Sequence, residues 1–167
     1  MGEEPRKAKL MVAIDESMSS YYALKWVLQN LKESINASGN PLYIFMVQPP
    51  SPISLSVFNA SVAHARLPCP ILTNTEYSNS FQDQMVSKGI LEKAKNICAI
   101  HGVKAETMAE AGDPKQAICN AVKKHNISLL VLGDPEVGKI RRALLGNSSS
   151  HYVDNASCSV LVVKKPE

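Results

Sequence analysis

The chain has few aromatic residues, no long apolar run and no long basic block. Aromatic residues make up 5% of the 167 residues, and 18 Lys and Arg stand against 15 Asp and Glu, a formal net charge of +3. Nucleic-acid surfaces normally combine clustered cations with interleaved aromatic side chains. A membrane-spanning helix needs about 20 consecutive apolar residues. We therefore expect no nucleic-acid partner and no membrane anchor.

The four cysteines form no metal-binding or redox motif. Cys69, Cys98, Cys119 and Cys158 are widely separated and include no Cys-x-x-Cys pair, so neither a zinc ribbon nor thioredoxin-like chemistry is indicated. The residues before the first predicted strand contain no apolar run typical of a secretory signal. These features predict reduced thiols and a cytoplasmic protein.

Catalytic motifs are also missing. The four histidines are dispersed, and the sequence contains no Gly-x-Ser-x-Gly elbow, P-loop or Rossmann glycine fingerprint. Covalent catalysis usually pairs a nucleophile with a base, and no such pair is recognisable. The sequence therefore favours a binding protein over an enzyme, with no metal site.

Short apolar runs alternate with helical periodicity along the chain. The hydrophobic fraction of 45% with 20% charged residues is typical of a folded protein, and the length fits one domain over 1–167. The predicted strands are Leu10–Ile14, Leu42–Val47, Val103–Ala109, Ser128–Leu132 and Cys158–Val163. The predicted helices are Ser19–Ala37, Phe81–Ile100, one that begins at Pro114 after the N-cap Asp113, and Ser148–Asn155.

This alternation predicts an α/β fold with a doubly wound parallel sheet and helices on both faces. The first and fourth strands are the most hydrophobic and should lie side by side at the centre, whereas Val103–Ala109 alternates and should lie nearer an edge. Ligands of such sheets bind beyond the carboxyl ends of the strands, where the strand order reverses. Asp15 and Gly133 are expected at that point.

The segment Gln48–Ser80 interrupts the alternation. It carries five prolines among many Ser and Asn residues. Because long loops inside compact domains tend to be functional or disordered, it is either a lid over the site or an unstructured insertion.

Glycines and hydroxyl residues after the fourth strand outline a nucleotide pocket. Gly133 would let the backbone approach a ribose or phosphate, and Gly146 precedes three serines at a predicted helix start, where free N–H groups attract anions. The alternative is helix capping by Asn147 or Ser148, and Asp15 is equally well explained as a turn or cap residue.

Three sequence features resemble universal stress proteins: Asp15 at the end of the first strand, Gly112-Asp113-Pro114 before a helix, and the closing segment RRALLGNSSSHYVDNASCSVLVVK. The Pro-rich insertion resembles plant members, and the likeness covers about Lys9 to Lys165. It implies a five-stranded sheet with strand order 3-2-1-4-5 and a homodimer. In one branch it implies binding of ATP or AMP through Gly-x-x-Gly, a nine-residue gap, and Gly-Ser/Thr.

The resemblance also assigns site residues. Ala13 and Asp15 would line the adenosine end, Val47 would meet the adenine, and Gly133 would approach the ribose. The phosphates would be held by Gly146, Asn147, Ser148 and Ser149.

The chain departs from that motif at two positions. Asn147 replaces the Ser/Thr and can still donate a hydrogen bond, whereas Glu136 replaces the second glycine and adds a negative charge. A carboxylate about 4 Å from a phosphate oxygen is repelled by roughly 1 to 4 kcal/mol, which Lys139, Arg141 or a divalent cation such as Mg²⁺ could offset.

Two functions follow as hypotheses. The first is a regulatory module that binds ATP or AMP in a stress response, with slow ATP hydrolysis as a weaker addition. The alternative is a dimeric interaction protein that has lost nucleotide binding because of Glu136. In either case the apolar last strand would need cover if it lies at the sheet edge. A two-fold partner would pair there through Val160, Leu161, Val162 and Val163, unless the N-terminal segment or the long loop folds over it.

Overall fold

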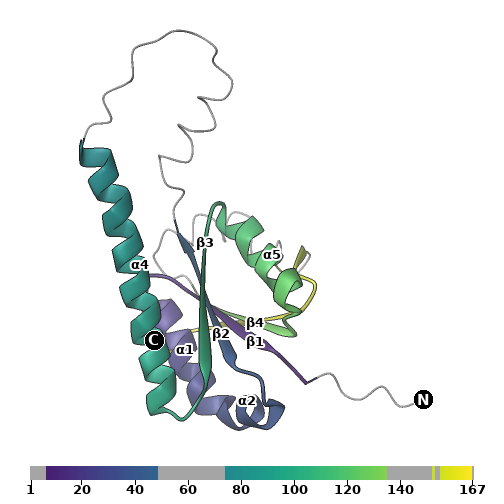
Figure 1. The fold of residues 1–167 in the computed structure, drawn as a ribbon. Coiled ribbons are helices and arrows are strands. Elements are labelled where there is room, and N and C mark those ends of the chain that lie inside the picture. The colour runs from purple at the N-terminus through teal and green to yellow at the C-terminus, as the bar shows by residue number, and fades with distance from the viewer. Residues whose placement is uncertain (1–6, 49–73, 135–151, 153–154, 167) are drawn as a thin grey trace.

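Five parallel strands form one sheet in the order β3-β2-β1-β4-β5 (Figure 1). The structure is a computed structural model and describes residues 7–48, 74–134, 152 and 155–166. The strands are β1 (Leu10–Ile14), β2 (Leu42–Gln48), β3 (Ala105–Ala111), β4 (Leu129–Gly133) and β5 (Ser159–Val163). The predicted strand order is confirmed, with β1 and β4 side by side and β3 at an edge.

Helices cover both faces of the sheet. They are α1 (Met18–Asn30), α2 (Lys32–Ser38), α4 (Asn74–Ile100) and α5 (Pro114–His125). One face of the sheet packs with α1, α2 and α4 around Val12, Ile44 and Val131. The other packs with α5 around Met11, Phe45 and Leu130. Because side chains alternate along each strand, apolar runs are needed to supply both layers.

The predicted helix Ser19–Ala37 is wrong in one respect, because it is two helices. The break falls at Leu31, whose φ of −116° and ψ of 3° lie outside the helical region. Just before it, the side-chain amide of Asn30 donates to the Trp26 carbonyl at 2.9 Å. A side chain that competes for a backbone carbonyl in this way favours a helix end.

The predicted loop Gln48–Ser80 is also too long at its end, since α4 already begins at Asn74. Helical periodicity missed this extension because the sequence from Asn74 to Ser80 is polar apart from Tyr77 and so carries no apolar period. The segment 49–73 lies outside the described residues, so the two readings of the loop stay predictions.

β3 begins two residues later than predicted. The N–H of Val103 donates to the Cys98 carbonyl at 2.9 Å and so belongs to the end of α4. The predicted helix Ser148–Asn155 lies largely outside the described residues, although Tyr152 and Asn155 are helical.

β5 pairs on one side with β4 and lies at the sheet edge. Its apolar side chains differ in exposure: Val160 and Leu161 are half-buried and Val162 is 39% exposed. Val163 is 5% exposed and packs in the core on the α1 side. The expectation of an exposed ladder is therefore wrong for Val163, because alternation turns it inward.

Candidate functional site

The strand order reverses at β1, which lies between β2 and β4. Val12 is in register with Ile44 on one side and with Val131 on the other. Asp15 directly follows β1, and Gly133 is the last residue of β4. The two predicted residues therefore emerge from neighbouring strands at the carboxyl edge of the sheet, which is where ligands of doubly wound sheets bind.

Asp15 is held in a turn that starts α1. Its Oδ1 accepts hydrogen bonds from the backbone N–H of Ser17 at 2.9 Å and from the Ser17 hydroxyl. The Ser17 hydroxyl oxygen in turn accepts the N–H of Ser20 at 3.2 Å and caps the helix. This is the turn and cap role that short polar side chains fill before helices. The carboxylate is therefore fixed before any ligand arrives.

Two further serines complete this network. The Ser20 hydroxyl is buried and donates to the Asp15 carbonyl at 3.1 Å. The hydroxyls of Ser17 and Ser19 lie 3.1 Å apart. We did not predict these serines as site residues, although a serine-rich helix start is a recognised capping signal.

Gly133 lies directly against the first turn of α1. A Cβ at this position would lie 2.4 Å from the Ser19 carbonyl oxygen and 2.8 Å from the Ser20 nitrogen. Only a residue without a side chain permits such an approach. Its φ is not in the left-handed region, so contact with the helix, rather than backbone conformation, requires glycine here. From the sequence we expected Gly133 to leave space for a ribose. In the described structure the first turn of α1 occupies the space beside it.

Ala13 and Val47 lie on the opposite face of the sheet from α1. Both are half-buried and pack against the cluster under α5. They come from adjacent strands, since Ala13 is in register with Phe45 and Ile14 with Met46. Asp15 follows Ile14 and Val47 follows Met46, so the structure brings Ala13, Asp15 and Val47 together at the carboxyl edge of the sheet.

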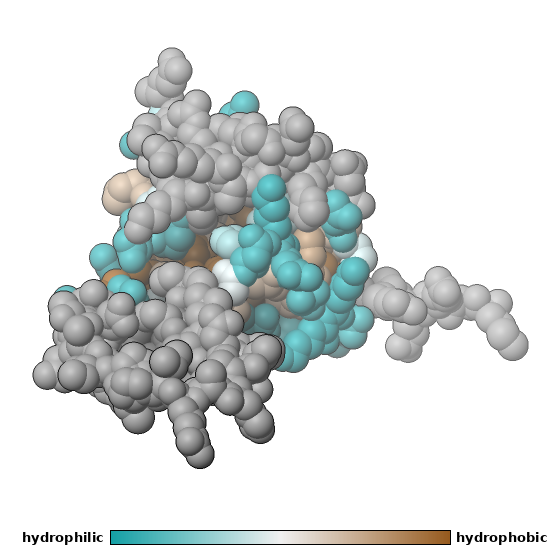
Figure 2. Space-filling view, turned by 90° about the horizontal axis from the view of Figure 1, so that it is seen from above, coloured by the Kyte–Doolittle hydropathy of each residue, from teal (hydrophilic) through white to brown (hydrophobic). Residues whose placement is uncertain are grey.

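A cavity of about 370 Å³ opens beside Asp15 on the α1 and α4 side. Its lining includes the apolar Leu24 and Ile90, and Asp15, Glu16 and Lys93 contribute charge. Figure 2 looks at the molecule from above, and hydrophobic residues are visible between hydrophilic ones. Of the predicted site residues that the structure describes, Asp15 alone lines the cavity, so the cavity and the Ala13–Val47 surface are separate features that meet at Asp15.

Lys93 was not singled out from the sequence. It carries no motif and lies one helical turn from the apolar Ile90 and Ile97, in the pattern of an ordinary amphipathic helix. Its Nζ lies 6.0 Å from the centre of the Tyr21 ring, the outer limit of a cation–π contact.

The remaining predicted site residues lie outside the described residues. They are Glu136, Gly146, Asn147, Ser148 and Ser149. In the part of the chain that the structure describes, no group of three His, Cys, Asp or Glu side chains is placed to hold a metal ion. Within the same residues, no helix is long and apolar enough to cross a membrane.

The described thiols are poor nucleophiles. Burial raises the pKa of Cys98 to about 11, and it also raises the pKa values of Cys119 and Cys158. Burial, followed by the nearby Cys119 and Asp113, raises the pKa of the Tyr152 hydroxyl. The reactive form of a thiol is the thiolate, and raised pKa values keep these thiols protonated at neutral pH.

Comparison with known protein families supports the same fold. The model of the Universal stress protein family matches residues 8–164, and the chain belongs to that family. It is 27% identical over 176 residues to a universal stress protein A-like protein of Arabidopsis thaliana, across 99% of this chain and 93% of the relative.

Solved structures share the fold. A universal stress protein family protein of Arabidopsis thaliana with AMP bound has a TM-score of 0.63 at 23% identity, covering 95% of this chain and 92% of its own. The universal stress protein from Archaeoglobus fulgidus in complex with dAMP has a TM-score of 0.60 at 18% identity, covering 94% and 98%.

Proposed function

We propose that this protein binds an adenine nucleotide, ATP or AMP, at the carboxyl edge of the sheet and acts as a regulatory module in a stress response. The observation that carries the proposal is the reversal of strand order at β1, with Asp15 fixed at that point by Ser17. Family members that hold AMP and dAMP have the same fold. The cytoplasmic location expected from the sequence belongs to the same proposal.

Calorimetric titration tests the binding. ATP, ADP and AMP are titrated with and without Mg²⁺, and saturable heat is expected with at least one of them. Asp15→Asn should weaken that binding, whereas Glu33→Gln removes an exposed charge on α2, outside the cavity, and should not. Absence of heat with all three nucleotides would reject the proposal.

The competing reading, loss of binding through Glu136, is less favoured but makes a distinct prediction. If the natural chain does not bind the nucleotide and Glu136→Gly does, the binding site is present and the Glu136 carboxylate prevents binding. If both bind, the carboxylate is tolerated. The proposed function is binding without hydrolysis of ATP. Release of phosphate from ATP faster than in a buffer blank would contradict this proposal.

We further propose a homodimer that pairs through β5. Val162 is 39% exposed on an edge strand, and edges of this kind are normally paired or covered. Val162→Glu should yield a monomer by light scattering coupled to gel filtration. Ile100→Glu is the matched control because Ile100 is 83% exposed at the end of α4. If the natural chain has the mass of a monomer by this measurement, the dimer is refuted, and the proposal of nucleotide binding is unaffected.

A further inference from the structure

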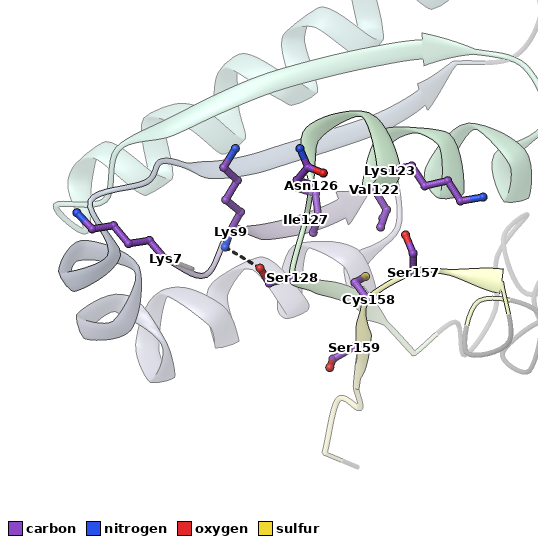
Figure 3. Close-up of a pocket in the computed structure, with 10 residues that line it drawn as sticks. All are labelled: Lys7, Lys9, Val122, Lys123, Asn126, Ile127, Ser128, Ser157, Cys158 and Ser159. Carbon is purple, nitrogen blue, oxygen red and sulfur yellow. Dashed lines mark hydrogen bonds between the residues drawn. The ribbon is translucent and has the colours of Figure 1, made fainter. Parts of the chain in front are cut away.

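A second recess lies at the amino-terminal edge of the sheet, opposite the candidate nucleotide site. It encloses about 690 Å³ between the start of β1, the end of α5 and the entry to β5 (Figure 3). Lys7, Lys9 and Lys123 line it, together with the neutral polar side chains of Asn126 and Ser157. None of the lining residues that the structure describes carries a carboxylate. We call this recess the basic groove.

Charge is distributed unequally between the two edges of the sheet. The carboxyl edge carries Asp15, Glu16, Asp113 and Asp134. In contrast, the described connections at the amino edge contain neither Asp nor Glu; they are residues 7–9, 39–41, 101–104, 126–128 and 155–158. The described connections at the amino edge therefore attract an anion without adding a carboxylate that would oppose it.

The carboxyl end of α5 also borders the groove, and the carbonyls at a helix end carry partial negative charge. Here those carbonyls have partners. Ile127 N–H donates to the Val122 carbonyl at 3.0 Å, and the Lys9 Nζ donates to the His125 carbonyl at 3.4 Å. The helix end is thus largely neutralised within the protein.

No carboxylate of the described residues neutralises the positive charge of the groove lysines. In the described residues, α5 makes an ion pair near this end through Lys124, which lies 3.7 Å from Glu110. Lys7, Lys9 and Lys123 have no described carboxylate within 4.0 Å. Their ammonium groups remain available to an external anion.

The lysines do not converge on one point. In Figure 3 the side chains of Lys7, Lys9 and Lys123 point in different directions around the groove, which suits several linked charges better than one phosphate ion. None of the described lining residues is aromatic, so they offer a nucleobase no stacking surface. Lysine binds phosphate as a point charge, and the described lining residues supply three such charges. We propose that the basic groove binds a chain of linked phosphates.

Titration calorimetry with sodium tripolyphosphate tests this proposal. Binding is expected at about 50 mM salt and should weaken strongly by about 200 mM. The reason is that binding releases counterions, and their release becomes less favourable as the salt concentration rises. The double variant Lys9→Gln/Lys123→Gln should weaken binding about tenfold and flatten the salt dependence. Gln at position 9 keeps a donor for the His125 carbonyl, and circular dichroism verifies the fold.

The matched control is Lys88→Gln/Lys95→Gln, which removes the same charge from exposed positions on α4, on the other face of the sheet. Its affinity should equal that of the natural chain. Equal weakening in both double variants, or no binding at low salt, overturns the proposal. Displacement of tripolyphosphate by saturating AMP would do the same, since it would place the phosphates at the nucleotide site. If the chain binds no AMP, the lysine variants still decide the question.

Discussion

Gly133→Ala should destabilise the protein because α1 leaves no space for a methyl group. The new Cβ would lie 2.4 Å and 2.5 Å from the carbonyl oxygen and carbon of Ser19, and 2.8 Å from the nitrogen of Ser20. All three are backbone atoms, so no side-chain rotation relieves the overlap and the first turn of α1 must move. Overpacking of this kind typically costs about 1 to 3 kcal/mol, and backbone contacts place Gly133→Ala near the upper end.

Thermal and urea unfolding measure the effect. A loss of about 2 to 3 kcal/mol should lower the Tm by roughly 4 to 12 °C for a chain of this length. Gly89→Ala is the control: it lies within α4 with nothing inside 4 Å of its added methyl group. In a helix, alanine is favoured over glycine by about 0.5 to 1 kcal/mol, so this variant should be slightly more stable.

The two explanations of Gly133 separate in this experiment. If Gly133 serves helix packing, its alanine variant loses stability whether or not a nucleotide is present. If Gly133→Ala unfolds within about 0.5 kcal/mol of the natural chain, the packing argument is refuted. Loss of nucleotide affinity without loss of stability would instead support the ribose contact expected from the sequence.

Three further substitutions are informative. Asp113→Ala removes the acceptor of the Gln116 N–H at 3.0 Å and should cost about 1 kcal/mol in urea unfolding, whereas Asp83→Ala, an exposed acid on α4, should cost close to nothing. Asp15→Ala removes the acceptor of two hydrogen bonds ahead of α1 and should cost about 1 kcal/mol by the same measurement. The pKa of Cys98 is raised from 9.0 to about 11, so the unfolded state ionises first as pH rises past 9. Stability should then fall by up to roughly 2 kcal/mol by pH 11, and Cys98→Ala should fall less.

The strands could be predicted from the sequence because burial on both faces demands uninterrupted apolar runs. Leu10–Ile14 and Leu42–Gln48 are such runs, and no polar side chain could replace them without lying in one of the two cores. Helix boundaries were less accessible. The break at Leu31 follows a hydrogen bond from the Asn30 side chain that the sequence does not reveal, and the early start of α4 has no apolar period to indicate it.

The candidate site was predictable in position but not in mechanism. Asp15 follows an apolar strand, and this alone places it at the carboxyl edge. The contact of Gly133 with Ser19 could not be foreseen, because it depends on how closely α1 crosses the end of β4. A glycine after a central strand has the same appearance in a sequence whether a helix or a ribose needs the space.

The two roles of Asp15 are compatible. Its Oδ1 is occupied by Ser17, which fixes the side chain, and a carboxylate has a second oxygen with its own lone pairs. A group already immobilised loses little conformational entropy when a ligand binds, so preorganisation favours affinity. The capping network and Gly133 therefore both determine where the start of α1 lies. The network fixes Asp15 to the start of α1, and Gly133 allows α1 to lie against β4. The sequence offered a turn or cap and a ligand contact as alternatives for Asp15; the described hydrogen bonds show the turn, and they leave the second carboxylate oxygen for the ligand contact that we propose.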